Sequence, residues 1–195
     1  MADKAVAKNT DDKVPTDKKL DDLYDLIDGI EIAMLTTRRG DGHLVSRPMQ
    51  TQERETGLDL WFMTNVETHK LDDLMSDPHV NLAYYKDRSR EWVSVSGLAT
   101  VTTDRELVRE LYKPDWKAWL GDEGGDRDGS ASDPRIALIL VEAESVTYMK
   151  VTKPKPVVLF EVARAMVTGS PPKVGDIRTV TDRDLDRRAQ RDGHA

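Results

Sequence analysis

The stretch Phe62-Met63-Thr64-Asn65-Val66-Glu67-Thr68-His69-Lys70-Leu71 joins the end of a strand to the start of a helix. Before it, apolar residues alternate along residues 58–64, which predicts a strand. After it, leucines at helical spacing predict a helix over residues 66–76, which ends before Asp77-Pro78 because proline disfavours helix at the preceding residue. A helix N-terminus offers unpaired N–H groups, and Lys70 adds a cation in the first turn. The junction is therefore a candidate anion site, although an Asn65 cap with a solvated Lys70 would give the same pattern.

The sequence around this junction predicts mostly strands joined as hairpins. Apolar or alternating runs predict strands over residues 31–37, 43–52, 80–85, 92–101 and 135–150. Helical spacing predicts a helix over residues 20–30 with Thr16 as its N-cap, and a capping box beginning at Thr103 predicts another. Six strands with short helices favour a mainly β (α+β), six-stranded antiparallel barrel over a doubly wound sheet. A barrel this narrow is filled with side chains, so a ligand must bind outside it or between two barrels.

Composition excludes several classes of protein. The 195 residues suit one domain, and 36 acidic against 29 basic side chains give a net charge of −7, which argues against nucleic-acid binding. The chain has no cysteine, and its four histidines lack ligand spacing, so we expect no disulfide and no metal site. No apolar run approaches the ~20 residues of a membrane helix, and no signal peptide is visible. We expect a soluble, cytoplasmic protein.

The two ends of the chain are polar. Residues 1–16 and 179–195 are rich in charged residues and poor in large apolar ones. Such stretches bury too little apolar area to offset the entropy lost on ordering. We expect two flexible tails around one domain of residues 17–178, the alternative being a tail that docks on a partner subunit.

The predicted strand of residues 43–52 carries a second candidate anion ligand. In Ser46-Arg47-Pro48-Met49-Gln50, alternation places Arg47 and Met49 on one face. The proline indicates an edge strand or a bulge, because it cannot donate to the sheet. The arginine offers a fork of donors that suits a phosphate or a carboxylate. Alone, this pattern also fits a surface edge strand with a solvated arginine.

Taken together, the two segments resemble the flavin mononucleotide (FMN)-binding split barrel of the pyridoxamine 5′-phosphate oxidase-like family. The resemblance extends from residue 17 to residue 180, and the later landmarks are most similar to its general stress protein branch. These landmarks are Asp77-Pro78-His79-Val80, the glycine strand of residues 95–101 before Asp104, Asp133-Pro134-Arg135, residues 163–169 and Gly175.

The resemblance implies a homodimer with two FMN molecules at the subunit interface. It implies that Arg47 and Lys70 hold the phosphate with help from Thr68, that Thr64 and Asn65 offer donors beside it, and that His69 stands where many members have arginine. The departure at His69 implies weaker or pH-dependent phosphate binding. The isoalloxazine ring would lie along Pro48, Met49 and Gln50, with Met63 and Thr64 flanking the ring or ribityl chain.

Two tryptophans are candidates for covering the flavin ring. Trp116 and Trp119 lie beside a Gly/Asp-rich loop, and in the stress-protein branch a tryptophan in this region is expected near the flavin. The alternative for at least one of them is a core or interface aromatic.

The resemblance implies an FMN-binding stress flavoprotein and a candidate low-specificity, FMN-dependent oxidoreductase. Oxidation of pyridoxamine phosphate is not expected, because residues 153–158 lack the Arg-Leu-His run that grips the vitamin's phosphate. No nucleophile–base pair is visible, so no catalytic residue is assigned. The alternatives are a non-enzymatic flavin binder or scavenger, and a barrel that holds a deazaflavin or a haem in the same groove.

Overall fold

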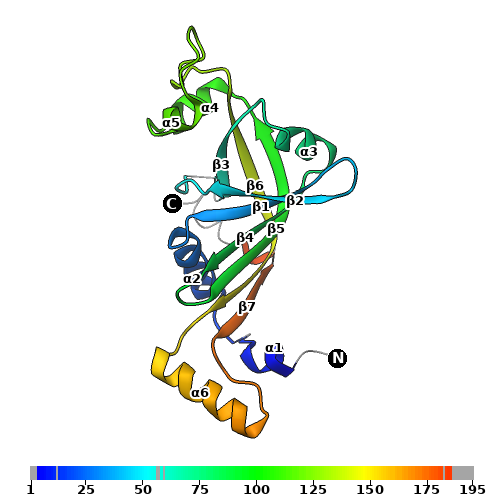
Figure 1. The fold of residues 1–195 in the computed structure, drawn as a ribbon, viewed down its shortest axis with the longest axis vertical. Coiled ribbons are helices and arrows are strands. Elements are labelled where there is room, and N and C mark those ends of the chain that lie inside the picture. Colours follow the sequence, from blue (N-terminus) through cyan, green and yellow to red (C-terminus); the bar gives the residue numbers. More distant parts are fainter. Residues whose placement is uncertain (1–3, 12, 56–57, 59, 182, 186–195) are drawn as a thin grey trace. The chain divides into compact units, whose positions relative to one another are not determined.

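The structure is a computed structural model that describes residues 4–11, 13–55, 58, 60–181 and 183–185. Its seven strands form one sheet in the order β2-β1-β4-β5-β6-β3, with β7 paired to β6 (Figure 1). The strands are β1 (Ile32–Arg38), β2 (Leu44–Gln50), β3 (Leu60–Asn65), β4 (His79–Lys86), β5 (Glu91–Thr102), β6 (Ile136–Lys150) and β7 (Asp176–Thr181). The helices are α1 (Lys4–Asn9), α2 (Thr16–Asp28), α3 (Lys70–Ser76), α4 (Arg105–Leu111), α5 (Trp116–Leu120) and α6 (Lys155–Thr168).

The predicted fold class, a mainly β antiparallel split barrel with short helices, is confirmed. All six predicted strands are present, with ends that differ by no more than two residues. The seventh strand, β7, and the helices α1, α5 and α6 were not predicted. Three pairs of strands with recorded register, β1–β2, β3–β6 and β6–β7, are antiparallel.

The chain divides into two compact units. The terminal unit comprises residues 1–31, 82–95 and 144–195, and the central unit comprises residues 32–81 and 96–143. Long strands pass from one unit to the other, since β5 and β6 each contain a boundary.

The terminal unit is organised around a buried carboxylate on α2. Asp22 is buried and accepts a hydrogen bond from the Lys150 Nζ at 2.6 Å and another from Arg178. Burial by itself favours the neutral form, but these bonds outweigh it and lower the pKa of Asp22. The carboxylate thus links α2 to β6 and β7.

The first residues of the chain also belong to this unit. The buried Asn9 at the end of α1 accepts hydrogen bonds from the backbone N–H of Val174 at 2.9 Å and of Gly175 at 3.3 Å. Thr10 forms a bridge with Ile177. The predicted N-terminal tail therefore has defined contacts, while its flexibility stays a prediction. Of the predicted C-terminal tail, residues 179–181 complete β7, and residues 182 and 186–195 lie outside the described residues.

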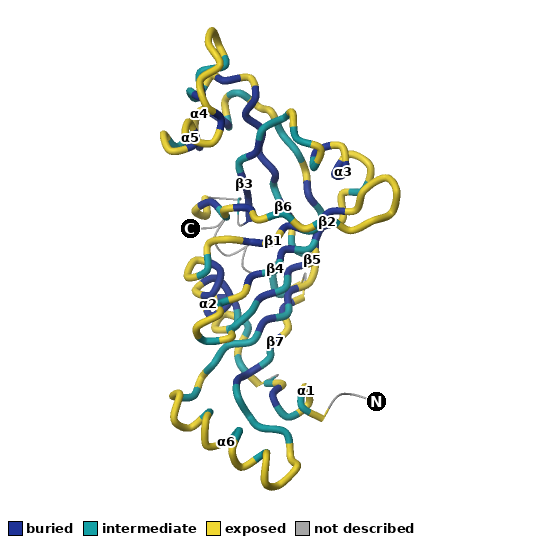
Figure 2. Tube along the Cα trace, viewed as in Figure 1, coloured by how far each residue is buried: buried dark blue, intermediate teal, exposed yellow. Residues whose placement is uncertain are grey.

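The exposed helix α6 is the other unexpected element of the terminal unit. None of its fourteen residues is buried, as the yellow and teal colours of Figure 2 show. Leu159, Phe160, Met166 and Val167 each expose at least two thirds of their surface. An apolar helix with this much exposure is typical of an interaction surface.

The central unit contains a core cluster that includes Trp61, Trp116, Val108 and Ile136. Its strands β5 and β6 approach so closely at Gly97 that a Cβ there would lie 2.0 Å from the carbonyl oxygen of Glu142. Only glycine fits this position, so the glycine strand noted in the sequence has a packing reason.

Three predicted helix starts were wrong. Asp104, not Thr103, caps α4, because its carboxylate accepts bonds from the second and third N–H groups of the helix. Thr16 is the first residue of α2 and follows the N-cap position, which Pro15 occupies. Helix α3 begins at Lys70, because residues 66–69 form a turn.

Candidate functional site

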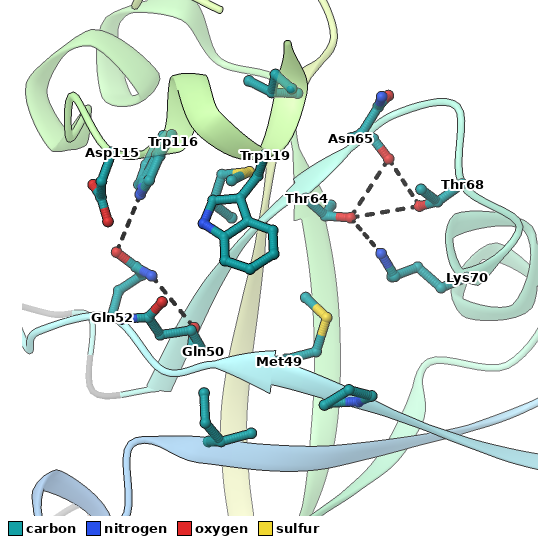
Figure 3. Close-up of a pocket in the computed structure, with 14 residues that line it drawn as sticks. Met49, Gln50, Gln52, Thr64, Asn65, Thr68, Lys70, Asp115, Trp116 and Trp119 are labelled. Atoms are coloured by element: carbon teal, nitrogen blue, oxygen red, sulfur yellow. Dashed lines mark hydrogen bonds between the residues drawn. The ribbon is translucent and has the colours of Figure 1, made fainter.

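A cavity of about 360 Å³ opens in the central unit at the junction of β3 and α3 (Figure 3). Residues of β2 and α5 also line this cavity. This volume lies in the range of small-molecule sites. Of the twelve residues that the sequence proposes for cofactor binding, ten line the cavity: Pro48, Met49, Gln50, Met63, Thr64, Asn65, Thr68, Lys70, Trp116 and Trp119. Arg47 and His69 are not among its lining residues.

A tight turn after β3 gathers the polar groups of the cavity. The Asn65 side-chain oxygen accepts a bond from the N–H of Glu67 at 2.8 Å, and the Asn65 carbonyl accepts one from the Thr68 hydroxyl at 2.8 Å. The Lys70 Nζ then donates to the Thr64 hydroxyl at 2.8 Å. The turn thus replaces the predicted helix start, and it sets two hydroxyls beside one ammonium group.

Lys70 is a half-buried cation at this end of the cavity. Burial lowers its pKa from the ordinary lysine value, and the positive charge of Arg47 lowers it further. No carboxylate of the described residues lies within ion-pair distance of Lys70. An anion bound here would relieve both the lost hydration and the repulsion, so the geometry suits a phosphate or carboxylate.

Arg47 points its donors at neighbouring protein groups. Its Nη1 donates to the Thr37 hydroxyl at 2.8 Å, and its Nη2 pairs with the Asp73 carboxylate at 2.9 Å. The same carboxylate oxygen accepts the Thr37 hydroxyl at 2.9 Å. Arg47 and His69 line a second hollow of mixed charge, and the His69 side chain is 96% exposed beside Asp72. That Arg47 and His69 contact a ligand phosphate stays a prediction.

The two tryptophans have different environments. Trp116 is buried and packs edge-on against Trp61 and Tyr112, with ring centroids 6.2 and 5.7 Å apart. Trp119 exposes 78% of its surface, and Figure 3 shows its indole between Gln50 and the Thr64–Lys70 group. The residue that could cover a planar ligand is therefore Trp119, whereas Trp116 belongs to the core.

Four lining residues were missed by the sequence analysis: Ile32, Gln52, Asp115 and Leu120. Ile32 pairs with Gln50 in the β1–β2 register, and Gln52 accepts a bond from the Trp116 indole N–H at 3.4 Å. Asp115 and Leu120 flank the two tryptophans. Alternation from Gln50 would have suggested Gln52, but the position of Asp115 depended on where α5 folds back.

A buried ion pair holds α5 in place. Arg135 is 1% exposed and donates to the carbonyl oxygens of Leu120 and Gly121, each at 2.9 Å, at the C-terminus of α5. It also pairs with Asp133 at 2.7 Å, and hydrogen bonding from Arg135 holds the pKa of that carboxyl far below its usual range. The Asp133-Pro134-Arg135 landmark thus acts on the cavity through α5.

The described residues lack two kinds of feature. They contain no group of three or more His, Cys, Asp or Glu side chains placed to hold a metal ion. None of the described helices combines the length and the apolar character needed to cross a membrane.

Comparison with known proteins assigns this chain to a family. The family model "Pyridoxamine 5′-phosphate oxidase like" matches residues 18–173. Protein bli-3 of Neurospora crassa is 39% identical over 187 residues, covering 94% of this chain and 90% of the relative. A structure from Jannaschia sp. CCS1, described as a general stress protein 26, aligns with a TM-score of 0.63 at 23% identity over 85% of this chain and 99% of that one. The general stress FMN/FAD binding protein of Xanthomonas citri aligns with a TM-score of 0.54 at 26% identity over 67% of this chain and 88% of its own. The chain belongs to the pyridoxamine 5′-phosphate oxidase-like family.

Proposed function

We propose that the cavity of the central unit binds FMN and that the protein is a flavoprotein of the general stress type. The single observation that carries this proposal is an apolar cavity with one half-buried cation, Lys70, at one end and an exposed indole, Trp119, at its mouth. A phosphate monoester attached to a planar ring matches that layout. The Xanthomonas citri relative, named as an FMN/FAD binding protein, supports the same ligand.

Different residues of the cavity would contact the phosphate and the ring of FMN. Lys70 and the hydroxyls of Thr64 and Thr68 would receive the phosphate, since together they offer a charge and two further donors. Met49 and Met63 would give an adaptable apolar contact to the ring. Bound FMN would supply hydride and electron transfer, while the protein supplies orientation and shields the ring from water.

We propose that a second copy of the chain completes the site. Trp119 and the outward face of β1, with Ile32 and Met34, expose large apolar side chains around or near the cavity. Exposed apolar surface of this kind is stabilised when a partner covers it. A homodimer would shield the cavity and would place the ring between two subunits. We also propose a cytoplasmic location, which the sequence suggests.

We propose a low-specificity, FMN-dependent oxidoreductase activity, with a flavin scavenger or carrier as the alternative. Among the lining residues of the cavity, Lys70 is the one cation, and the cofactor phosphate would engage it. A second phosphate, such as that of pyridoxamine phosphate, then finds no charge to bind it. Oxidation of that vitamin is accordingly not expected.

The test begins with the visible absorption spectrum of the purified protein and with titration by FMN. We expect a flavin spectrum or micromolar-or-tighter uptake of added FMN, in a species with twice the mass of the chain. A colourless protein that takes up no FMN would refute the proposal. If a deazaflavin or a haem displaces FMN in a competition titration, that compound is favoured as the cofactor. If the reduced protein is reoxidised at a rate no higher than that of free reduced flavin, the scavenger is favoured.

A further inference from the structure

Helix α5 brings a carboxylate and an indole to the same cavity. Asp115 directly precedes the helix and Trp119 is four residues later, a spacing that places two side chains on one helical face. Both line the cavity, and Figure 3 shows Asp115 on the side of the cavity away from Lys70. Trp119 is 78% exposed, so its ring is accessible to a ligand.

The charge of Asp115 is not neutralised by its neighbours in the described chain. The nearby Lys113 pairs with Glu53 at 2.9 Å, and Lys117 acts on Asp128, whose pKa it helps to lower. Asp115 itself has no ion pair and no side-chain hydrogen bond within the described residues. This side of the cavity is therefore negative, whereas the side with Lys70 is positive.

A carboxylate beside an exposed tryptophan favours one class of ligand. A cation gains from the negative face of the indole and from the carboxylate, while an anion is repelled by the same two groups. A flat cation gains more than a compact one, because it also stacks on the ring.

We propose that Asp115 and Trp119 form a subsite for a planar organic cation, of the N-alkylpyridinium class, beside the cofactor. This inference rests on the proposed function only for the identity of that cofactor. The subsite gives the cavity a charge preference: the phosphate of the cofactor binds at Lys70, and a second, cationic ring compound binds at α5. Anionic ring compounds of the same size bind less tightly.

The test uses three pyridine compounds of nearly equal size: 1-methylnicotinamide, which is a cation, neutral nicotinamide, and nicotinate, which is an anion. Each is titrated into the FMN-loaded protein and followed by the flavin absorption band, and into FMN-free protein and followed by tryptophan fluorescence. We expect the cation to bind about tenfold more tightly than nicotinate at low salt, since a cation–π contact and one Coulomb pair each contribute several-fold.

Two variants and one control separate the parts of the subsite. Asp115→Asn should reduce the preference from about tenfold to about threefold, the part that the indole contributes, and Trp119→Leu should weaken the cation more than nicotinamide. Asp126→Asn removes the same charge from an exposed residue that lines neither hollow, and should leave the ranking unchanged.

The outcomes distinguish this inference from the proposed function. Equal affinities for the three compounds, no binding of any of them, or a tenfold preference that Asp115→Asn leaves unchanged would overturn the subsite. Binding to FMN-free protein alone would overturn its place beside the cofactor. A charge ranking seen by tryptophan fluorescence in a protein that takes up no FMN would support the cation subsite and refute the proposed cofactor.

Discussion

Two charges of the chain, Asp22 in the terminal unit and Lys70 in the central unit, have opposite environments. In the terminal unit, the Asp22 carboxylate is surrounded by Lys150 and Arg178, and each cation has a carboxylate partner. In the central unit, the half-buried Lys70 has one hydrogen-bond partner among the described residues, the neutral Thr64 hydroxyl. A buried charge with a full set of partners serves the fold, whereas one with a neutral partner remains available for a ligand. The difference separates structural from binding charges within one sequence.

Replacing Asp22 gives the largest expected effect and tests the structural half of this comparison. Asp22→Ala should lower the free energy of unfolding by about 3–5 kcal/mol, because it removes the close counter-ion of the buried Arg178 and the partly buried Lys150. The carboxylates that remain are farther away, Asp176 at 3.9 Å from Arg178 and Asp25 at 3.7 Å from Lys150. Urea denaturation measures the change. The exposed Asp21, one residue earlier, is the matched control, and Asp21→Ala should cost far less. Equal losses for the two variants would show that Asp22 does not organise the unit.

The pH dependence of stability gives a second view of the same residue. The folded pKa of Asp22 is below its unfolded value, so its contribution is present above the unfolded pKa and is lost as pH falls through the folded pKa. Acid unfolding of the wild type should therefore be steeper than that of Asp22→Asn. The measurement is the free energy of unfolding as a function of pH below 5, and parallel curves would contradict it.

Replacing Lys70 tests the binding half. Lys70→Met should weaken FMN by about 1.5–3 kcal/mol, because it removes a charge-assisted bond to the phosphate. Its unfolding free energy should be unchanged or slightly higher near neutral pH, since burial of the charged ammonium costs stability there. Fluorescence titration measures the affinity for FMN, and urea denaturation measures the free energy of unfolding. A loss of stability as large as that of Asp22→Ala would remove the distinction between the two charges.

The two tryptophans sharpen the comparison within the central unit. Trp116→Leu should destabilise the fold by about 2–4 kcal/mol, because it opens a cavity beside Trp61. Trp119→Leu should leave the unfolding free energy within about 0.5 kcal/mol, and should weaken FMN by about 0.5–1.5 kcal/mol through lost stacking. The same two assays check both variants. Similar effects on stability would mean that the exposure of Trp119 does not persist in solution.

The smallest effect concerns alkaline pH. The pKa of Lys70 is lowered by burial and by Arg47, and a bound phosphate requires the charged form. FMN affinity should thus begin to fall at a lower pH than for an ordinary surface lysine. Lys70→Arg should move that fall to higher pH, because arginine keeps its charge. Identical pH profiles for the two proteins would exclude Lys70 as the phosphate ligand.

Much of the fold could be predicted because the strands have strong local patterns. Alternation along residues 58–64 and the apolar run of residues 31–37 predicted β3 and β1 to within two residues. The helix starts could not be predicted as well, since Thr103 and Asp104 are both good caps and only the backbone geometry decides which one faces the first N–H groups. β7 was missed because its sequence, Asp-Ile-Arg-Thr-Val-Thr, contains an arginine, and only the folded structure buries that arginine beside Asp22.

The candidate site was predictable in its types of residue and less so in their positions. Ten of the twelve proposed residues line one cavity, and they come from β2, β3, the turn that follows β3, the start of α3, and α5. Pro48, Met49 and Gln50 are consecutive and all line it, so alternation along the strand does not account for their positions. Arg47 lies on the strand face that alternation predicts, but its long side chain donates to Thr37 and Asp73 and does not line the cavity. Asp115 could not be found from its neighbours, because the loop that Arg135 anchors determines where α5 lies.

The sequence by itself determined the mainly β class, the family and the strand–turn–helix junction that carries Lys70, since these depend on short-range periodicity and on local turn chemistry. Only the tertiary structure decided which charges are paired and which tryptophan is exposed. Ion pairs such as Asp22–Arg178 join residues 156 positions apart, and no local pattern encodes a contact at that separation. The proposed function therefore depends on residues that local sequence patterns indicate and on long-range contacts that form only in the folded chain.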